Sequence, residues 1–345
     1  VVPYVAGEQP QDQNVIKLNT NECPYPPAPG VEEVLHHFDG NVLRKYPDPD
    51  VTLLRNALAD RYQVKPGQVF VGVGSDDVLS MAFLTFFNSD KPVLFPDITY
   101  SFYDVWADLY RIPYECQPLD EDFHWKKEDY LKENGGIVLA NPNAPTGLAV
   151  SASQIEEIIA ANQDSVVIVD EAYVDFGAES CVPLVDKYEN LLVTQTFSKS
   201  RSLAGLRIGF AIGSQKLIGY LNDAKFSFNS YTMNAPTIAA GVASVEDEEY
   251  FQKTVARVVR TRENTKKELT RLGFTFPDSS TNFIFATHKD IPGEELFQAL
   301  RSHNIYVRHW NKPRIQDSLR ISIGTDEEMQ ALIAFLEDYL ERRGN

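Results

Sequence analysis

The stretch Thr196-Phe197-Ser198-Lys199 is followed a short way on by Ala204-Gly205-Leu206-Arg207. Upstream, the apolar run Val166-Val167-Ile168-Val169 ends in Asp170-Glu171-Ala172-Tyr173. A lysine after a strand, an arginine behind it and an aspartate at the end of a buried strand are groups suited to holding pyridoxal 5′-phosphate (PLP). The amine attaches to the cofactor, Ser198 and the arginine bind its phosphate, and the aspartate pairs with its pyridine nitrogen. These segments therefore predict an enzyme built around PLP.

Short apolar runs alternate with helix-length stretches on both sides of this segment. They lie at residues 69–73, 92–95, 137–140, 166–169, 191–194 and 209–212, after a helical pattern over 51–62. Several of these runs are continuous rather than alternating, which is typical of strands buried on both faces of a sheet. The regular alternation predicts an α/β layered domain with a mostly parallel sheet.

From about Glu246 the pattern changes. Residues 246–272 indicate one long charged amphipathic helix, followed by strands at 281–286, 305–308 and 319–323 and helices at 293–303 and 326–343. This mixture predicts a smaller α+β domain. We therefore divide the chain into an N-terminal arm with part of the small domain (1–35), a large PLP-binding domain (36–245) and a small C-terminal domain (246–345).

Composition excludes several classes of partner. The chain has 345 residues, which predicts roughly two domains of ~150 residues each. The formal net charge of −17 argues against nucleic acid or an anionic membrane as partner. No apolar run approaches the ~20 residues that span a bilayer, and the first residues lack a signal-peptide pattern. We expect a cytoplasmic protein.

Cysteines and histidines carry no recognisable site. Cys23, Cys116 and Cys181 are far apart and odd in number, and no CxxC occurs, which favours free thiols in a reducing compartment. The six histidines show no HxxH or HExxH spacing. We therefore expect no metal site.

Two loops follow predicted strands and can reach a ligand. In Val73-Gly74-Ser75-Asp76, glycine and a helix start favour an anion, although helix caps of this kind are common and the signal alone is weak. The loop Asn141-Pro142-Asn143-Ala144-Pro145-Thr146-Gly147 can be an ordinary Pro-rich turn. It can also place an asparagine at a strand's carboxyl end, where open α/β sheets bind ligands.

Asp170 and Lys199 each have an ordinary structural interpretation. Asp170 follows β-branched residues, where a carboxylate is costly unless paired; a structural salt bridge would satisfy it, and a protonated pyridine nitrogen would satisfy it better. Tyr173, in the same segment, can donate a hydrogen bond to the cofactor's O3′. Lys199 can be a solvated lysine, but the preceding strand and flanking serines favour a drier site beside a cofactor.

Taken together, these segments resemble the fold-type I PLP-dependent aminotransferases, and most closely the histidinol-phosphate aminotransferase family. The resemblance covers nearly the whole chain. Besides the segments above it rests on Leu18-Asn19-Thr20-Asn21-Glu22-Cys23-Pro24-Tyr25, Arg44-Lys45-Tyr46-Pro47-Asp48-Pro49, Asn304-Ile305-Tyr306-Val307-Arg308 and Leu319-Arg320-Ile321-Ser322-Ile323-Gly324-Thr325. In combination these are highly specific for the superfamily and moderately specific for the histidinol-phosphate branch.

The resemblance implies roles for individual residues. Lys199 binds PLP covalently and later moves the proton, with Asp170 on the pyridine nitrogen and Tyr173 on O3′. The other residues that it implies for the cofactor are the phosphate ligands Ser75, Asp76, Ser198 and Arg207, the ring-stacking Tyr100, Asn143 in the Pro-rich loop, and Tyr46 supplied by the neighbouring subunit of a homodimer. Those implied for substrate are Arg320, which binds a carboxylate, and Tyr25 and Arg308, which line the pocket for the substrate phosphate.

Two departures from the family pattern stand out. Ala144 occupies the position before Pro-Thr-Gly where most members have an asparagine that contacts O3′, so that Asn143 or Asn141 has to substitute. The loop after Glu22 reads Cys23-Pro24-Tyr25-Pro26, where the family usually has Asn-Pro-Tyr-Gly. Tyr25 is retained, but the loop can differ.

The activity that the resemblance implies is transamination between L-histidinol phosphate and 2-oxoglutarate in histidine biosynthesis, with glutamate as the partner amino acid. An aromatic or broad-specificity aminotransferase and a threonine-phosphate decarboxylase share the scaffold and stay open as alternatives. A PLP-binding regulatory module without catalysis is a further alternative. Lys199, Asp170 and Arg320, together with the lack of an appended basic domain, argue against it; Ala144 alone favours it.

Overall fold

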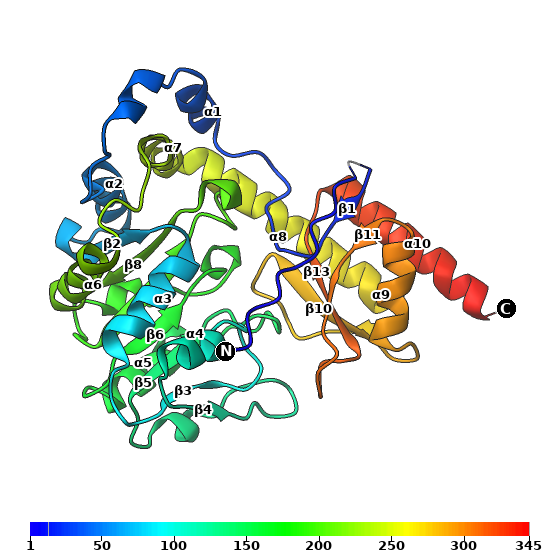
Figure 1. The fold of residues 1–345 in the computed structure, drawn as a ribbon. Helices are drawn as coiled ribbons and strands as arrows, with labels where there is room; N and C mark the ends of the chain where they lie inside the picture. The colour runs from blue at the N-terminus through cyan, green and yellow to red at the C-terminus, as the bar shows by residue number, and fades with distance from the viewer. Residues whose placement is uncertain (13, 345) are drawn as a thin grey trace.

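A seven-stranded sheet forms the centre of the larger part of the molecule (Figure 1). The computed structural model describes residues 1–12 and 14–344. The strand order is β2-β8-β7-β6-β5-β3-β4, and β8 alone runs against its neighbours in this sheet. The strands are β2 (Val69–Gly72), β3 (Val93–Pro96), β4 (Tyr114–Gln117), β5 (Gly136–Ala140), β6 (Val167–Asp170), β7 (Leu191–Thr196) and β8 (Gly209–Gly213). The predicted α/β fold with a mostly parallel sheet is confirmed.

Helices cover both faces of this sheet, as continuous apolar strands require. One face packs against α2 (Thr52–Tyr62), α5 (Ala152–Ala161) and α7 (Ala235–Glu246). The other face packs against α3 (Ser75–Phe86), α4 (Tyr103–Tyr110) and α6 (Gln215–Phe228). In β6, Val167 and Val169 face the first layer and Ile168 the second, so one buried strand anchors both cores. Short 3₁₀ turns connect these elements: η1 (Gly40–Arg44), η2 (Pro66–Gln68), η3 (Lys127–Tyr130), η4 (Val174–Phe176), η5 (Val182–Leu184) and η6 (Ala204–Leu206).

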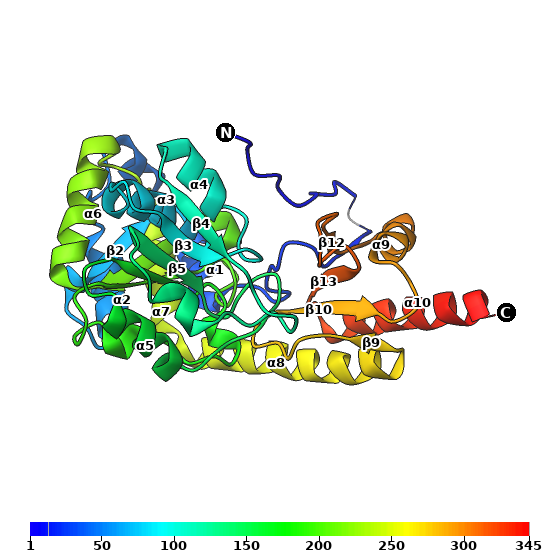
Figure 2. The same cartoon turned by 90° about the horizontal axis from the view of Figure 1, so that it is seen from below.

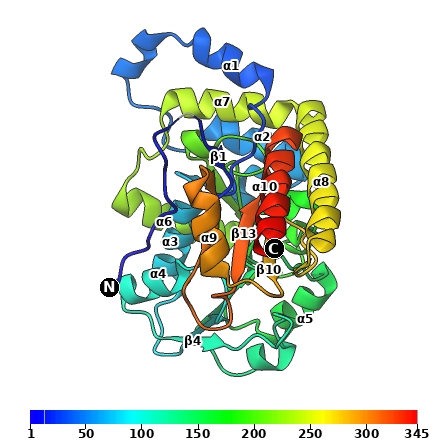
Figure 3. The ribbon, with the colours of Figure 1, turned by 90° about the vertical axis from the view of Figure 1, so that its right-hand side faces the viewer.

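A second core lies in the C-terminal part. Its antiparallel sheet has the order β12-β13-β10-β9, with β9 (Phe274–Thr275), β10 (Phe283–His288), β12 (Arg308–His309) and β13 (Ser318–Ser322). The helices here are α8 (Glu248–Arg271), α9 (Gly293–Ser302) and α10 (Asp326–Gly344). Figure 3 shows α8 and α10 running beside each other, and Figure 2 shows both along one side of β10 with α9 on the other.

The long helix predicted from Glu246 begins later than expected. Glu246 ends α7, and Asp247 caps α8 by accepting a hydrogen bond from the backbone N–H of Tyr250 (3.0 Å). An aspartate cap satisfies one of the free N–H groups of a helix start, and Glu248 and Glu249 follow in the first turn, where the helix dipole favours them. The acidic run is therefore a break between two helices rather than the start of one.

The N-terminal segment connects the two parts. β1 (Ile16–Lys17) pairs in parallel with β11 (Ile305–Tyr306), and α1 (Pro29–His36) packs against α7. Residues 1–12, which we call the arm, extend from β1 toward α4 (Figures 1 and 2). There the Tyr4 ring stacks on Phe102 with centroids 4.2 Å apart. The domain limits at residues 35 and 245 stay predictions.

Candidate active site

A small pocket lies at the carboxyl ends of β5 and β6. It has a volume of ≈ 60 Å³, and we call it the inner pocket. Its lining is Ser75, Tyr100, Ala140, Pro142, Ala144, Asp170, Ala172, Tyr173 and Lys199. Parallel strands gather their carboxyl ends at one edge of a sheet, which is where open α/β sheets bind ligands. The fold thus brings Lys199, Asp170, Tyr173, Tyr100 and Ser75 together from distant parts of the sequence.

Asp170 is a buried carboxyl group without a cationic partner in the described part of the chain. It is the last residue of β6 and is 5% exposed. Its Oδ2 accepts from the Tyr103 hydroxyl (2.7 Å) and its Oδ1 from the Ala172 N–H (3.2 Å). Burial is the main cause that raises the pKa of Asp170 to about 6. A ligand cation in the inner pocket would stabilise its ionised form.

Tyr103 was missed by the sequence reasoning. It is the first residue of α4, is fully buried, and packs against Phe83 and Phe95 while its hydroxyl reaches Asp170. Burial, and then the charge of Asp170, raises the pKa of the phenol above its usual value, so it acts as a donor. No sequence pattern indicated this contact, because apolar packing explains a buried tyrosine equally well.

We expect Tyr103→Phe to lower turnover without abolishing it. The change keeps the ring packing but leaves one carboxylate oxygen of Asp170 without its donor, a loss of about 1–3 kcal/mol for a buried acceptor. Turnover should fall about tenfold. The pH at which the visible absorbance band of bound PLP changes should also shift. A stopped-flow and spectral titration measures both. Tyr110→Phe, at the other end of α4, is the matched control, and an effect of equal size there would contradict the assigned contact.

Lys199 follows β7, and contacts of its own amine and of the two residues after it hold it in place. Its Nζ donates to the Thr20 carbonyl (3.0 Å) and lies 5.7 Å from the Tyr173 ring centroid. No carboxylate lies within ion-pair distance of it among residues 1–12 and 14–344. Next to it, Ser200 donates to Asp175 (2.5 Å) and Arg201 donates to the Ser244 carbonyl (2.8 Å). The backbone is thereby fixed on one side while the amine points to the inner pocket.

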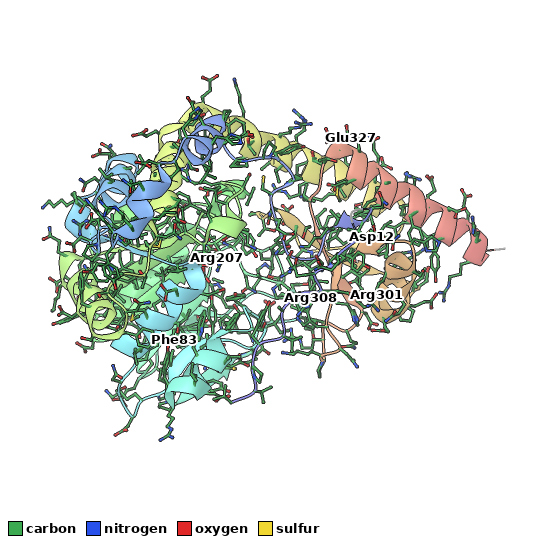
Figure 4. All side chains as sticks on the ribbon, turned by 45° about the horizontal axis from the view of Figure 1, so that its top comes forward. Asp12, Phe83, Arg207, Arg301, Arg308 and Glu327 are labelled. Atoms are coloured by element: carbon green, nitrogen blue, oxygen red, sulfur yellow. The ribbon has the colours of Figure 1, made fainter. Side chains whose placement is uncertain are left out.

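An anion cradle lies beside the inner pocket. Gly74 (φ +90°) precedes Ser75 and Asp76, the first residues of α3, whose free N–H groups and helix dipole favour an anion. Arg207 donates to the Ser198 hydroxyl (3.4 Å) and lies 3.8 Å from the Asp76 carboxylate. Figure 4 places Arg207 on the side of the large sheet, facing the region between the two parts. The structure therefore brings Ser75, Asp76, Ser198 and Arg207 together, and their role toward a phosphate stays a prediction.

Gly74→Ala is expected to weaken this cradle. A Cβ at position 74 would lie 2.4 Å from Arg207 Nη2, and the positive φ is a further strain for alanine. Arg207 would have to move away from Ser198, so the affinity for PLP should fall about tenfold or more because a charge-assisted contact is misplaced. Equilibrium dialysis of the protein with PLP measures this. Gly205→Ala, where a Cβ meets nothing within 4 Å, is the control and should bind PLP as the parent does.

Tyr100 and Tyr173 flank the inner pocket, each with its hydroxyl engaged. Tyr100 donates to Asp76 (2.8 Å), which connects the ring to the anion cradle. Tyr173 accepts from the Asn21 amide (2.9 Å), and its ring packs edge-on against Phe283. Asn21 belongs to the segment that the sequence marked, but its contact with Tyr173 could be found only from the structure.

Asn143 does not reach the inner pocket. Its amide nitrogen donates to the Ile98 carbonyl and to Thr146, and its oxygen accepts from Thr99. The Asn141 amide is likewise engaged with Val150 within the loop. Ala144 lines the pocket instead. Both asparagines thus fold the loop, and neither takes the place of the missing side chain at position 144.

A larger cavity of ≈ 270 Å³, which we call the outer cavity, adjoins the inner pocket through Tyr100 and Ala144. Its wall includes Tyr4, Trp310, Lys312, Arg314 and Arg320. Arg320 donates from Nη2 to the Asn19 carbonyl (3.0 Å), whereas its enclosed Nε has no protein partner. A guanidinium with free donors beside a cavity is suited to a carboxylate or a phosphate.

Three predicted residues lie away from both cavities. Arg308 donates to the Val5 and Ala6 carbonyls of the arm (2.9 and 3.3 Å). Tyr25 lies under the Arg257 guanidinium, 4.1 Å from the ring centroid. Tyr46 is 82% exposed and stacks on Tyr231, so within one chain it does not approach the cradle.

Together these contacts fit PLP. The inner pocket offers an amine, a buried carboxyl group that lacks a cation, and an adjacent anion cradle in which a glycine gives the arginine room.

Among the described residues, no group of three or more His, Cys, Asp or Glu side chains is placed to hold a metal ion. No helix in the described ranges has the length and apolar character needed to cross a membrane.

Comparison with known proteins gives consistent matches over nearly the whole chain. Residues 13–336 match the family described as aminotransferase class I and II. The histidinol-phosphate aminotransferase of Lactococcus lactis subsp. cremoris is 55% identical over 343 residues, covering 99% of this chain and 96% of that protein. The one from Acinetobacter baumannii is 52% identical over 338 residues, with 97% and 94% covered.

A solved structure gives the same fold. The histidinol-phosphate aminotransferase from Sinorhizobium meliloti, in complex with pyridoxal-5′-phosphate, superposes with a TM-score of 0.85 at 23% sequence identity. The match covers 94% of this chain and 91% of that one. The arrangement of a large mostly parallel sheet and a smaller antiparallel one is therefore shared with a protein that binds PLP.

Proposed function

Because this chain belongs to the aminotransferase class I and II family, we propose that it transfers an amino group between L-histidinol phosphate and 2-oxoglutarate, a step in histidine biosynthesis. The chain is a PLP-dependent transaminase. One structural observation carries the substrate assignment: Arg320 presents unpaired donors beside the outer cavity, next to the inner pocket. The phosphate of one substrate and the carboxylate of the other can bind there in turn.

Each residue around PLP has a separate proposed role. When bound, PLP supplies an electron sink for the carbon that loses its proton. Ser75, Asp76, Ser198 and Arg207 hold its phosphate, and Asp170 holds the charge on its ring nitrogen. Lys199 Nζ would attach the cofactor and, when free, would serve as the base that takes the proton from the substrate carbon. Tyr100 would cover the ring, and Tyr173, oriented by Asn21, would donate to the O3′ oxygen.

The active unit that we propose is a homodimer in the cytoplasm. Exposed apolar side chains occur on α1, on and after η1, and at and after the end of α6, where Tyr46 stacks on Tyr231. They are Leu35, Val42, Leu43, Tyr46, Phe226, Phe228 and Tyr231. A surface of this kind is typical of a subunit interface. In such a dimer we propose that Tyr46 reaches the partner's anion cradle, whereas within its own chain it stacks on Tyr231. The three free cysteines suit a reducing compartment.

Steady-state kinetics test the substrate assignment. With 2-oxoglutarate as acceptor, kcat/KM for L-histidinol phosphate should exceed that for unphosphorylated L-histidinol about 100-fold or more, since a charge-assisted contact with a guanidinium is lost. L-Phenylalanine and L-threonine phosphate serve as competitors from the two related activities. A higher kcat/KM for phenylalanine, or carbon dioxide release from threonine phosphate, would contradict the proposal.

A further inference from the structure

Trp310 lies between two arginines of neighbouring strands. Arg308 on β12 is directly opposite Arg320 on β13, so their side chains lie on the same face of the sheet. Trp310 directly follows β12, and its ring contacts both of these side chains. Its ring centroid is 5.4 Å from the Arg308 Cζ and 5.1 Å from the Arg320 Cζ. The indole therefore faces both cations at once.

The two guanidiniums are directed to different places. Arg308 donates to the Val5 and Ala6 carbonyls and thereby fastens the arm (Figure 4 shows it on the side of the small sheet). Arg320 donates to the Asn19 carbonyl and lines the outer cavity together with Trp310. Across the described ranges neither arginine forms an ion pair with a carboxylate. Aromatic rings and backbone carbonyls surround both charges.

An indole suits this position for a physical reason. It attracts a cation through its face, but it makes no hydrogen bond to it and adds no negative charge. A carboxylate in its place would neutralise Arg320 and occupy the donors that a ligand needs. An aliphatic side chain would let the two like charges repel each other without any attractive surface between them.

We propose that Trp310 is the positioning residue of the substrate-anion site, an inference that rests on the proposed function for the identity of the anions. Its ring holds Arg320 toward the outer cavity and Arg308 toward the arm. Arg320 thus stays available to a phosphate or carboxylate group, whereas Arg308 fastens the arm, whose Tyr4 lines the outer cavity. The resemblance assigned Arg320 to a carboxylate and Arg308 to the substrate phosphate, and the contacts of this one ring account for the different positions of the two side chains.

Two variants of the PLP-loaded enzyme test the proposal, with inorganic phosphate as the probe. Its dissociation constant follows from the change in the PLP absorbance band or from competitive inhibition. Trp310→Leu should raise this constant about tenfold, since two cation–aromatic contacts are lost, whereas Trp310→Phe should stay within about threefold. The kcat at saturating substrate should change little in both. Trp310→Gln gives the same comparison if the leucine variant is insoluble, because the residue is half-exposed.

Controls separate this idea from a structural effect and from the proposed function. Trp125→Leu removes another half-exposed tryptophan that contacts neither arginine, and should bind phosphate as the parent does. Arg320→Met should abolish phosphate binding. Equal phosphate affinity in Trp310→Leu and the parent, or a phenylalanine variant as weak as the leucine one, would overturn the inference. If the parent binds phosphate through Arg320 but leaves histidinol phosphate unchanged, the proposed function fails and this inference stands.

Discussion

Lys199→Ala is expected to abolish transamination, lowering turnover by at least about 10⁴-fold. In the proposed mechanism Lys199 provides both the covalent attachment of the cofactor and the base, and in the described part of the chain no other lysine lines the inner pocket. The visible absorbance band of enzyme-bound PLP should also disappear or move, because the remaining PLP is held only by non-covalent contacts. Single-turnover kinetics and an absorbance spectrum of the PLP-saturated variant measure the two effects.

Lys216→Ala is the matched control for this experiment. Lys216 lies on the exposed surface in a pair with Glu189, away from both cavities, so the variant should keep the parent's turnover and spectrum. The anion cradle does not depend on Lys199, and Lys199→Ala should therefore still bind PLP reversibly. Measurable turnover with the parent's spectrum in Lys199→Ala would show that the amine has been misassigned.

Asp170→Asn is expected to have the second largest effect. An amide leaves the charge of the pyridine nitrogen without its partner, and breaking a buried ion pair on one side costs about 3–5 kcal/mol. We therefore expect turnover to fall at least about 100-fold at a saturating concentration of PLP. The asparagine side chain has nearly the size and shape of the aspartate that it replaces, so the fold should persist. Asp164→Asn, on the exposed surface, should leave turnover unchanged.

The dependence of PLP binding on pH distinguishes this role from a structural one. In the unloaded protein burial raises the pKa of Asp170 to about 6, so below that pH the carboxyl group is mostly protonated and cannot pair with a cation. The affinity for PLP should therefore fall as the pH is lowered through 6. The phosphate of PLP also titrates near pH 6, but it does so equally in Asp170→Asn. A pH profile that is the same in the variant and the parent would remove Asp170 from the cofactor's charge balance.

Features set by local sequence could be predicted well. Asp170 is the last residue of β6 and Lys199 lies three residues after β7, and the sheet itself fixes the position of residues at the carboxyl end of a parallel strand. The alternation of continuous apolar runs with helices determined the α/β fold for the same reason. Ser75 and Asp76 were recognisable because a glycine before a helix start is a local signal.

Contacts between distant segments could not be predicted. The hydroxyl of Tyr103 reaches Asp170 only because α4 packs on the face of the sheet beneath β6, and nothing in the helical pattern of residues 103–110 distinguishes that tyrosine from a core residue. Asn143 has the right place along the chain, but the turn of its loop directs its amide to Ile98 and Thr146. Arg308 has the predicted strand position, and its partner, the arm, has no periodicity that would reveal it.

The most direct test of the central claim is an absorbance titration of the PLP-loaded enzyme with L-histidinol phosphate alone. Because the first half-reaction needs no acceptor, the visible band of the lysine-bound cofactor should convert fully to the band of the aminated cofactor, and 2-oxoglutarate should restore it. A band that L-histidinol phosphate leaves unchanged, while L-phenylalanine or L-glutamate converts it, would contradict the claim that this enzyme acts on histidinol phosphate.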